Sequence, residues 1–164
     1  MKDSIRKLAV FGAVVPCVFL TGCSIKQEVK PITYRPQQVC IVNNTAVKEG
    51  VLDALDEGFK NHGLTPRVIP GVYEEKFNAW YPTWQMQQAQ GCDAMVLYVA
   101  NWTWDLALYM YYANIWMTSS NGTSELARAV YNSGRGGANP AKFINGHNKI
   151  IELVNQMLAS MPAQ

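Results

Sequence analysis

Side chains with the chemistry for catalysis or metal binding are sparse in this sequence of 164 residues. Of the two histidines, His62 closes an apolar periodic segment, where it would cap a helix, and His147 lies on an apolar stripe, where a partly buried histidine is expected. Glu74 and Glu75 are adjacent acidic residues, and we expect them to be a solvated pair in a loop. The sequence contains neither a nucleophile elbow nor a phosphate-binding P-loop. We therefore predict no catalytic residue, no metal site and no cofactor.

One glycine-rich segment has the composition of an anion-binding loop. Residues Gly134–Pro140 read GRGGANP and lead into an apolar periodic segment. Backbone amides near the start of a helix, together with the guanidinium of Arg135, would suit a phosphate or carboxylate. Arg135, Gly136 and Gly137 are the residues that would hold it. The spacing matches no nucleotide-binding fingerprint, however, so the alternative is a connection between a strand and a helix that binds nothing.

Aromatic residues are concentrated in the middle of the chain. Strand alternation over residues 106–118 would place Tyr109 and Tyr111 on one face, with Tyr112 and Trp116 on the other. One face must be core, and the other is either a second packed layer or a surface for a partner, because Tyr and Trp dominate binding hot spots. The predicted partner contacts, near a turn at residues 101–105, are Trp102, Trp104, Tyr109 and Tyr111. The full cluster comprises Trp80, Tyr81, Trp84, Tyr98, Trp102, Trp104, Tyr109, Tyr111, Tyr112 and Trp116.

The N-terminus has the pattern of an export signal. Basic residues Lys2, Arg6 and Lys7 precede an apolar stretch over residues 8–20, which is too short to span a bilayer comfortably. It ends in Leu20-Thr21-Gly22-Cys23, which resembles the lipobox of bacterial lipoproteins. This resemblance implies cleavage between Gly22 and Cys23 and attachment of a diacylglyceryl group to the thiol of Cys23. Acyl chains on this residue would anchor the protein to a membrane.

The expected cleavage changes the charge and the cysteine count of the remaining chain. Residues 1–22 hold three basic side chains and one acidic one, which leaves 11 of each sign in residues 23–164. A neutral chain gives no support for a nucleic-acid partner. Cys40 and Cys92 remain, and export would place them in an oxidising compartment. They form either a structural disulfide or two buried thiols in neighbouring strands.

We expect three segments: a signal peptide over 1–22, a lipidated N-terminus and polar tether over 23–37, and one globular domain over 38–161. Apolar runs and helical spacing within the domain predict one mixed sheet of about five strands with a long helix after the first strand, a short helix and a C-terminal amphipathic helix. The expected strands cover 39–42, 65–69, 93–101, 106–118 and 124–131, and the expected helices cover 46–62, 83–89 and a segment that begins at 140. The fold class is α/β, of the layered α+β kind.

A lipobox, a tether containing proline, and this order of elements together resemble a family of small proteobacterial lipoproteins. More remotely, the chain is similar to the periplasmic domain shared by the curli secretion lipoprotein CsgG and the peptidoglycan-synthase activator LpoB. The likeness is specific at Leu20–Cys23 and loose over residues 38–160. Ser24, rather than Asp, follows the cysteine, which in enterobacterial-type sorting implies the outer membrane, facing the periplasm.

Two functions of different class follow from the sequence. In the first, the chain is a non-enzymatic envelope adaptor that binds another envelope protein through its aromatic hairpin or a sheet edge. In the second, it is a small-ligand or anion binder, or an enzyme, that uses the Gly134–Pro140 loop. We favour the first, because the sequence has so few side chains that could act in catalysis.

Overall fold

The computed structural model describes residues 25–48, 50–137 and 139–163. The expected signal peptide, its cleavage site at Gly22 and the expected lipidation site at Cys23 lie outside the described residues. Within the described part, no helix is both long and apolar enough to cross a membrane.

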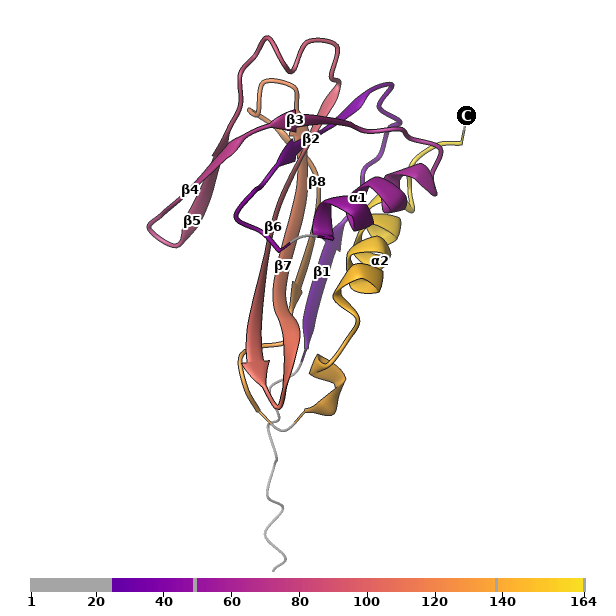
Figure 1. Cartoon of the computed structure of the whole chain (residues 1–164). Coiled ribbons are helices and arrows are strands. Elements are labelled where there is room, and N and C mark those ends of the chain that lie inside the picture. The colour runs from indigo at the N-terminus through magenta and orange to yellow at the C-terminus, as the bar shows by residue number, and fades with distance from the viewer. Residues whose placement is uncertain (1–24, 49, 138, 164) are drawn as a thin grey trace, which may run out of the picture.

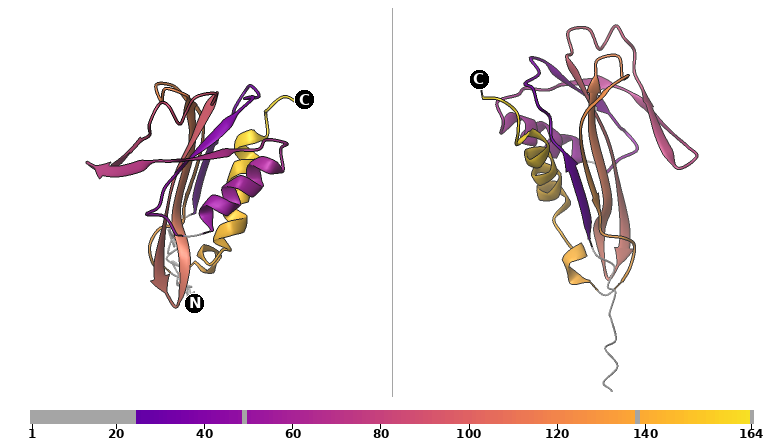
Figure 2. Two further views of the ribbon diagram at one scale, coloured as in Figure 1. Left: turned by 45° about the horizontal axis from the view of Figure 1, so that its top comes forward. Right: turned by 180° about the vertical axis from the view of Figure 1, so that it is seen from behind.

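The architecture is mixed α+β, with a large twisted sheet covered on one face by two helices (Figure 1). The six strands of this sheet, in spatial order, are β1 (Lys26–Lys30), β8 (Glu125–Asn132), β7 (Ala107–Ser119), β6 (Ala94–Asp105), β2 (Val39–Asn43) and β3 (Arg67–Pro70). The helices are α1 (Val51–Lys60) and α2 (Gly146–Leu158), and a short 3-10 helix, η1 (Pro140–Lys142), precedes α2. Strands β4 (Val72–Lys76) and β5 (Ala79–Thr83) form a separate two-stranded arm that projects from the main sheet (Figures 1 and 2).

The sheet carries apolar side chains on both faces. Val96, Ala113 and Ile115 belong to the core beneath the two helices, together with Leu55 of α1 and Val154 of α2. A second, smaller core lies on the other face, where the arm and residues 84–92 cover it with Tyr73, Trp80, Trp84, Ala89 and Cys92. Because both faces of β6 are covered, its first seven residues are all buried, as expected of a central strand.

The two helices pack against one another as well as on the sheet. A Cβ atom on Gly58 of α1 would lie 2.9 Å from the Cβ of Val154 in α2, so glycine is what allows this approach. Helix α2 begins where the side chain of Asn145 accepts a hydrogen bond from the N–H of Asn148. The predicted C-terminal amphipathic helix is present, but it begins at Gly146 rather than at 140, because Pro140–Lys142 forms the separate 3-10 helix η1. The buried residues of α2 are Ile150, Leu153, Val154, Met157 and Leu158.

The predicted meander is present, and its first strand, β6, continues four residues beyond the expected end at 101. Strands β6 and β7 pair antiparallel over their whole length and turn at Leu106, whose φ is 62°. The Asn121-Gly122 turn joins β7 to β8, with Gly122 at a φ of 75° and its N–H donating to the carbonyl of Ser119. The register slips by one residue between Asn101 and Trp102, so Tyr111 has no partner residue on β6.

The polar tether expected over 23–37 is wrong for residues 26–30. These residues form β1, which pairs antiparallel with β8 from Lys26 opposite Asn132 to Lys30 opposite Arg128. Ile32 follows, fully buried in the helix-side core, and its N–H donates to the carbonyl of Met157 in α2. The sheet therefore begins before residue 38 and gains a sixth strand at this edge.

Two further elements differ from the prediction. The helix expected over 46–62 begins only at Val51, because Gly50 adopts a left-handed conformation with a φ of 94°. The short helix expected over 83–89 is wrong, since Ala79–Thr83 is strand β5 and the residues after it make single turns, such as Gln88 N–H to the carbonyl of Gln85. Instead of the single sheet of five strands that was predicted, the described residues form two sheets with eight strands in all.

Cys40 and Cys92 form a disulfide, with their Cα atoms 5.8 Å apart. Of the two alternatives that the sequence left open, the structure thus has the disulfide. Cys40 lies in β2 and Cys92 lies just before β6, and these two strands are neighbours in the sheet. The bridge closes a loop that contains α1, β3 and the whole β4–β5 arm.

Candidate functional site

The end of the β6–β7 hairpin and the glycine-rich loop form one assembly, which we call the hairpin–loop end. Its centre is Tyr109, which is only 1% exposed. The Tyr109 hydroxyl donates to the carbonyl of Gly134 at 3.3 Å and accepts from the N–H of Gly136 at 2.9 Å. Its ring packs edge-on against Phe143, with centroids 5.4 Å apart. The structure therefore brings the predicted hairpin and the predicted loop together.

The polar groups of the loop are largely used within this assembly. The guanidinium of Arg135 hydrogen-bonds to the hydroxyl of Tyr111 and lies 4.6 Å from the centroid of its ring. The N–H of Gly136 is taken by Tyr109, and the carbonyl of Gly137 accepts from Lys142 Nζ at 2.6 Å. The Gly136 N–H is therefore not free for an anion, and Arg135 is held against Tyr111. These contacts hold the loop against the hairpin.

Lys142 is a nearly buried cation within the same assembly, at 3% exposure. Its Nζ pairs with the carboxylate of Asp105 near the hairpin turn. It also lies 5.2 Å from the centroid of the Tyr109 ring and 5.1 Å from that of Phe143. A buried ammonium needs a counter-ion and further contacts, and Lys142 has both. It ties η1 to the end of the hairpin.

The four predicted partner contacts have very different exposures. Trp104 is 72% exposed, Trp102 and Tyr111 are partly buried, and Tyr109 is buried. Tyr109 therefore cannot contact a partner in the folded protein, and that part of the prediction is wrong. Leu106 and Leu108 are 85% and 55% exposed beside Trp104 and were not among the predicted contacts. The sequence held a signal for them, since both leucines closely follow the predicted turn at residues 101–105.

The predicted division of the aromatic residues between two faces does not hold across the bulge. Strict alternation would place Met110 on the same face as Tyr112 and Trp116. Instead Met110 lies in the helix-side core with Ala113 and Ile115, whereas Tyr112 and Trp116 belong to the core on the other face. The extra residue, Tyr111, resets the alternation. The prediction that Tyr109 and Tyr112 lie on opposite faces of the strand consequently does not hold.

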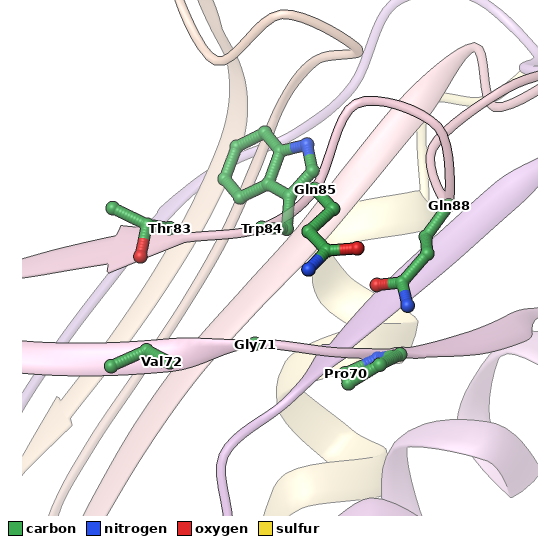
Figure 3. A pocket seen from close by; sticks show the side chains of 7 residues that line it. All are labelled: Pro70, Gly71, Val72, Thr83, Trp84, Gln85 and Gln88. Carbon is green, nitrogen blue, oxygen red and sulfur yellow. The ribbon is translucent and has the colours of Figure 1, made fainter.

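A groove that the sequence did not indicate lies at the base of the β4–β5 arm (Figure 3). It has a volume of about 290 Å³ and is lined by Pro70, Gly71, Val72, Thr83, Trp84, Gln85 and Gln88. The amides of Gln85 and Gln88 extend toward the Pro70–Val72 segment, whereas the Trp84 ring points the other way (Figure 3). This lining carries no charged side chain. Such a surface suits a neutral peptide better than an anion.

Tyrosine hydroxyls fix the arm to the main sheet. The hydroxyl of Tyr73 in β4 donates to the carbonyl of Val42 at 2.8 Å and accepts from the N–H of Tyr98 at 3.3 Å. Tyr98 in turn accepts from the N–H of Asn44 at 3.1 Å. Burial raises the pKa of both the Tyr73 and the Tyr98 hydroxyl. Both hydroxyls are therefore neutral structural groups, and the base of the arm is held rigidly.

The remaining titratable candidates do not converge on a site. His62 Nε2 lies 3.0 Å from Asn155 Oδ1, and His147 Nε2 lies 3.0 Å from Glu57 Oε2 on the neighbouring helix. His147 is exposed rather than partly buried as predicted. Glu74 lies in β4 rather than in a loop, and a hydrogen bond from Lys76 lowers its pKa. Among the described residues, no group of three or more potential metal ligands comes together.

Comparisons with known proteins concern the fold alone. No protein-family model matches the sequence, and no curated protein is similar to it in sequence. Among solved structures, it is similar to the PelC dodecamer from Paraburkholderia phytofirmans, with a TM-score of 0.50 and 9% identity over 86% of this chain and 99% of that chain. A single-residue variant of that protein gives the same TM-score at 10% identity. TolB from Acinetobacter baumannii gives a TM-score of 0.45 at 14% identity, over 85% of this chain and 32% of that chain.

Proposed function

We propose that this chain is an exported, lipid-anchored envelope protein that acts as a non-enzymatic adaptor. The observation that carries the proposal is the lipobox, Leu20–Cys23, which follows a basic and then an apolar segment. The Cys40–Cys92 disulfide supports export, because disulfides persist mainly in oxidising compartments. Ser24 favours the outer membrane, with the domain facing the periplasm.

The β4–β5 arm is the surface that best suits a protein partner. Phe77 at its turn is 98% exposed and Tyr81 in β5 is 49% exposed. The groove at its base offers apolar contacts and two glutamine amides. Beside it, β3 is an edge strand of only four residues, and a sheet edge can accept an added strand. The arm and the β3 edge together would suit a partner that packs against the exposed aromatic side chains and adds a strand at the sheet edge.

A second copy of this chain is a further candidate partner. The structural neighbour PelC is a dodecamer, and an arm that projects from each subunit could reach an adjacent one. The other alternative, a small-ligand binder or enzyme that uses the Gly134–Pro140 loop, has less support. Its Arg135 side chain and Gly136 amide already bond to Tyr111 and Tyr109.

Replacement of Cys23 by serine tests the anchor. We expect the wild type to fractionate with membranes and to incorporate labelled palmitate, and the Cys23→Ser variant to incorporate none, because serine has no thiol to receive the lipid. Cys17→Ser is the matched control and should leave labelling unchanged. Equal labelling of the Cys23→Ser variant and the wild type would contradict the proposed anchor.

A photoreactive phenylalanine analogue at Phe77 tests the arm. We expect irradiation of intact cells to yield one dominant protein adduct, and an adduct at twice the mass of this chain would identify a second copy as the partner. The same analogue at Asn61, exposed at the end of α1, is the control and should give less than a tenth of that yield. Comparable yields at the two positions would argue against a specific contact at the arm.

A further inference from the structure

The turn of the β6–β7 hairpin presents a compact apolar tip. Trp104 and Leu108 are cross-strand partners, so their side chains share one face, and Leu106 lies at the turn between them. Their exposed fractions are 72%, 55% and 85%. Exposed apolar side chains clustered at one end of a molecule mark a contact with a protein or a membrane. We call these three residues the apolar tip.

The topology places the apolar tip at the end of the molecule from which the chain leads back to Cys23. Strand β1 is antiparallel to β8, and β8 is antiparallel to β7, so β1 and β7 run in the same direction. The first residue of β7 is at the tip, and β1 therefore also starts toward that end (Figure 1).

The strand register shows how close Cys23 can come to the apolar tip along the direction of the strands. Lys26 is level with Asn132, which pairs with Tyr112, which in turn pairs with Asn101. From Asn101 the hairpin continues for five residues to Leu106, about 16 Å at the rise of a strand. Cys23 precedes Lys26 by three residues and can reach at most about 11 Å from it. A lipid on Cys23 can therefore lie within a few ångströms of the level of the apolar tip.

Two cationic side chains lie against aromatic rings of the hairpin just behind the apolar tip. Lys48 Nζ lies 5.8 Å from the centroid of the Trp102 ring, and Arg135 lies over Tyr111. The acidic group at the turn, Asp105, pairs with Lys142. Apolar and tryptophan side chains at the end of an element, followed by a band of tyrosine, lysine and arginine, suit the acyl and headgroup layers of a bilayer.

We propose that Trp104, Leu106 and Leu108 insert into the interface of the same membrane that holds the lipid on Cys23. The inference rests on the proposed anchoring for the position of that membrane. It adds a second contact, made by the protein itself. Two separate contacts with one membrane fix the orientation of the domain, whereas a lipid on a single residue leaves it free to rotate. In this orientation the β4–β5 arm projects from the far part of the sheet, clear of the membrane (Figure 2).

Fluorescence quenching in vesicles tests this proposal. The full lipidated protein is reconstituted into vesicles of phosphatidylethanolamine and phosphatidylglycerol whose acyl chains carry bromine, which quenches nearby tryptophan. We expect wild-type emission to fall relative to vesicles without bromine. In Trp104→Phe we expect that loss to shrink at least threefold. Trp80→Phe, which changes a tryptophan in the arm, should keep the wild-type loss.

A second variant guards against an indirect effect of Trp104→Phe. Adding Leu108→Trp to it puts a tryptophan back into the apolar tip at the opposing position, and the quenching should return. Unchanged quenching in Trp104→Phe, or none in the wild type, overturns the proposal.

Flotation of the vesicles separates this proposal from the anchor. Protein that floats but shows no quenching at Trp104 overturns the membrane contact of the apolar tip and leaves the lipid anchor intact. Protein that fails to float, and that carries no diacylglyceryl group by mass spectrometry, overturns the anchor and with it the placement of the apolar tip.

Discussion

Replacement of both Cys40 and Cys92 by alanine is expected to lower the free energy of unfolding by about 4 kcal/mol. The two residues are separated by 52 positions, and the chain-entropy model gives a value of this size for a loop of that length. The unfolded chain gains freedom when the cross-link is lost, while the folded strands still pair. Urea denaturation of the wild type and the double variant, followed by circular dichroism, measures the difference.

Reduction provides a matched control for this prediction. A reductant should destabilise the wild type to about the level of the Cys40→Ala/Cys92→Ala variant and should leave the variant itself unchanged. The cysteine side chains are buried, so some loss of packing is included in the value for the variant. A change of less than about 1 kcal/mol on reduction would contradict a stabilising cross-link.

The sequence predicted best those elements whose own apolar pattern matches their final burial. The meander of β6, β7 and β8 and the helix α2 are of this kind, because each has a stripe or run of apolar residues that the fold buries. Strand β1 is different. Its sequence, KQEVK, is polar because it is an edge strand with alternate residues exposed, and edge strands typically carry such charges. Only pairing with β8, about 100 residues away, makes it a strand.

The arm escaped prediction because its turn lacks the usual residues. Both Phe77 and Asn78 have positive φ values, 53° and 60°, as in the turn that Asn-Gly normally forms. Pro82 directly precedes the helix predicted over 83–89, and proline is typical of the start of a helix. In the structure it lies instead in β5, within a two-stranded hairpin, where a missing N–H is tolerated. The groove depends on this arm, so it could not be predicted either.

The candidate site was predicted as two separate features, and the structure joins them. Aromatic residues on β7 and glycines after β8 were recognised individually, but no periodic pattern links them. Their contact depends on the bulge at Tyr111 and on the path of the loop around the hairpin. Because this contact buries Tyr109, the side chains that the end of the hairpin exposes most are those of the apolar tip. The tyrosines hold the tip in place.

Tyr109 is the residue on which we expect this assembly to depend most. Tyr109→Ala should lower the free energy of unfolding by about 3–5 kcal/mol, the usual range for loss of a buried aromatic side chain. Tyr109→Phe keeps the ring and its contact with Phe143 but removes the hydroxyl that bonds to Gly134 and Gly136. Two backbone groups then lose their partner, and we expect a loss of about 1–3 kcal/mol.

Hydrogen exchange distinguishes a local role of the Tyr109 hydroxyl from general destabilisation. In Tyr109→Phe the amide of Gly136 should exchange faster by a larger factor than amides in the centre of β6, because the hydroxyl is its acceptor. Tyr111→Phe is the control, since the hydroxyl it removes bonds to the exposed Arg135 side chain and its loss should cost less than about 1 kcal/mol. If Gly136 exchanged equally fast in the wild type and in Tyr109→Phe, the Tyr109 hydroxyl would not be what closes the loop onto the hairpin.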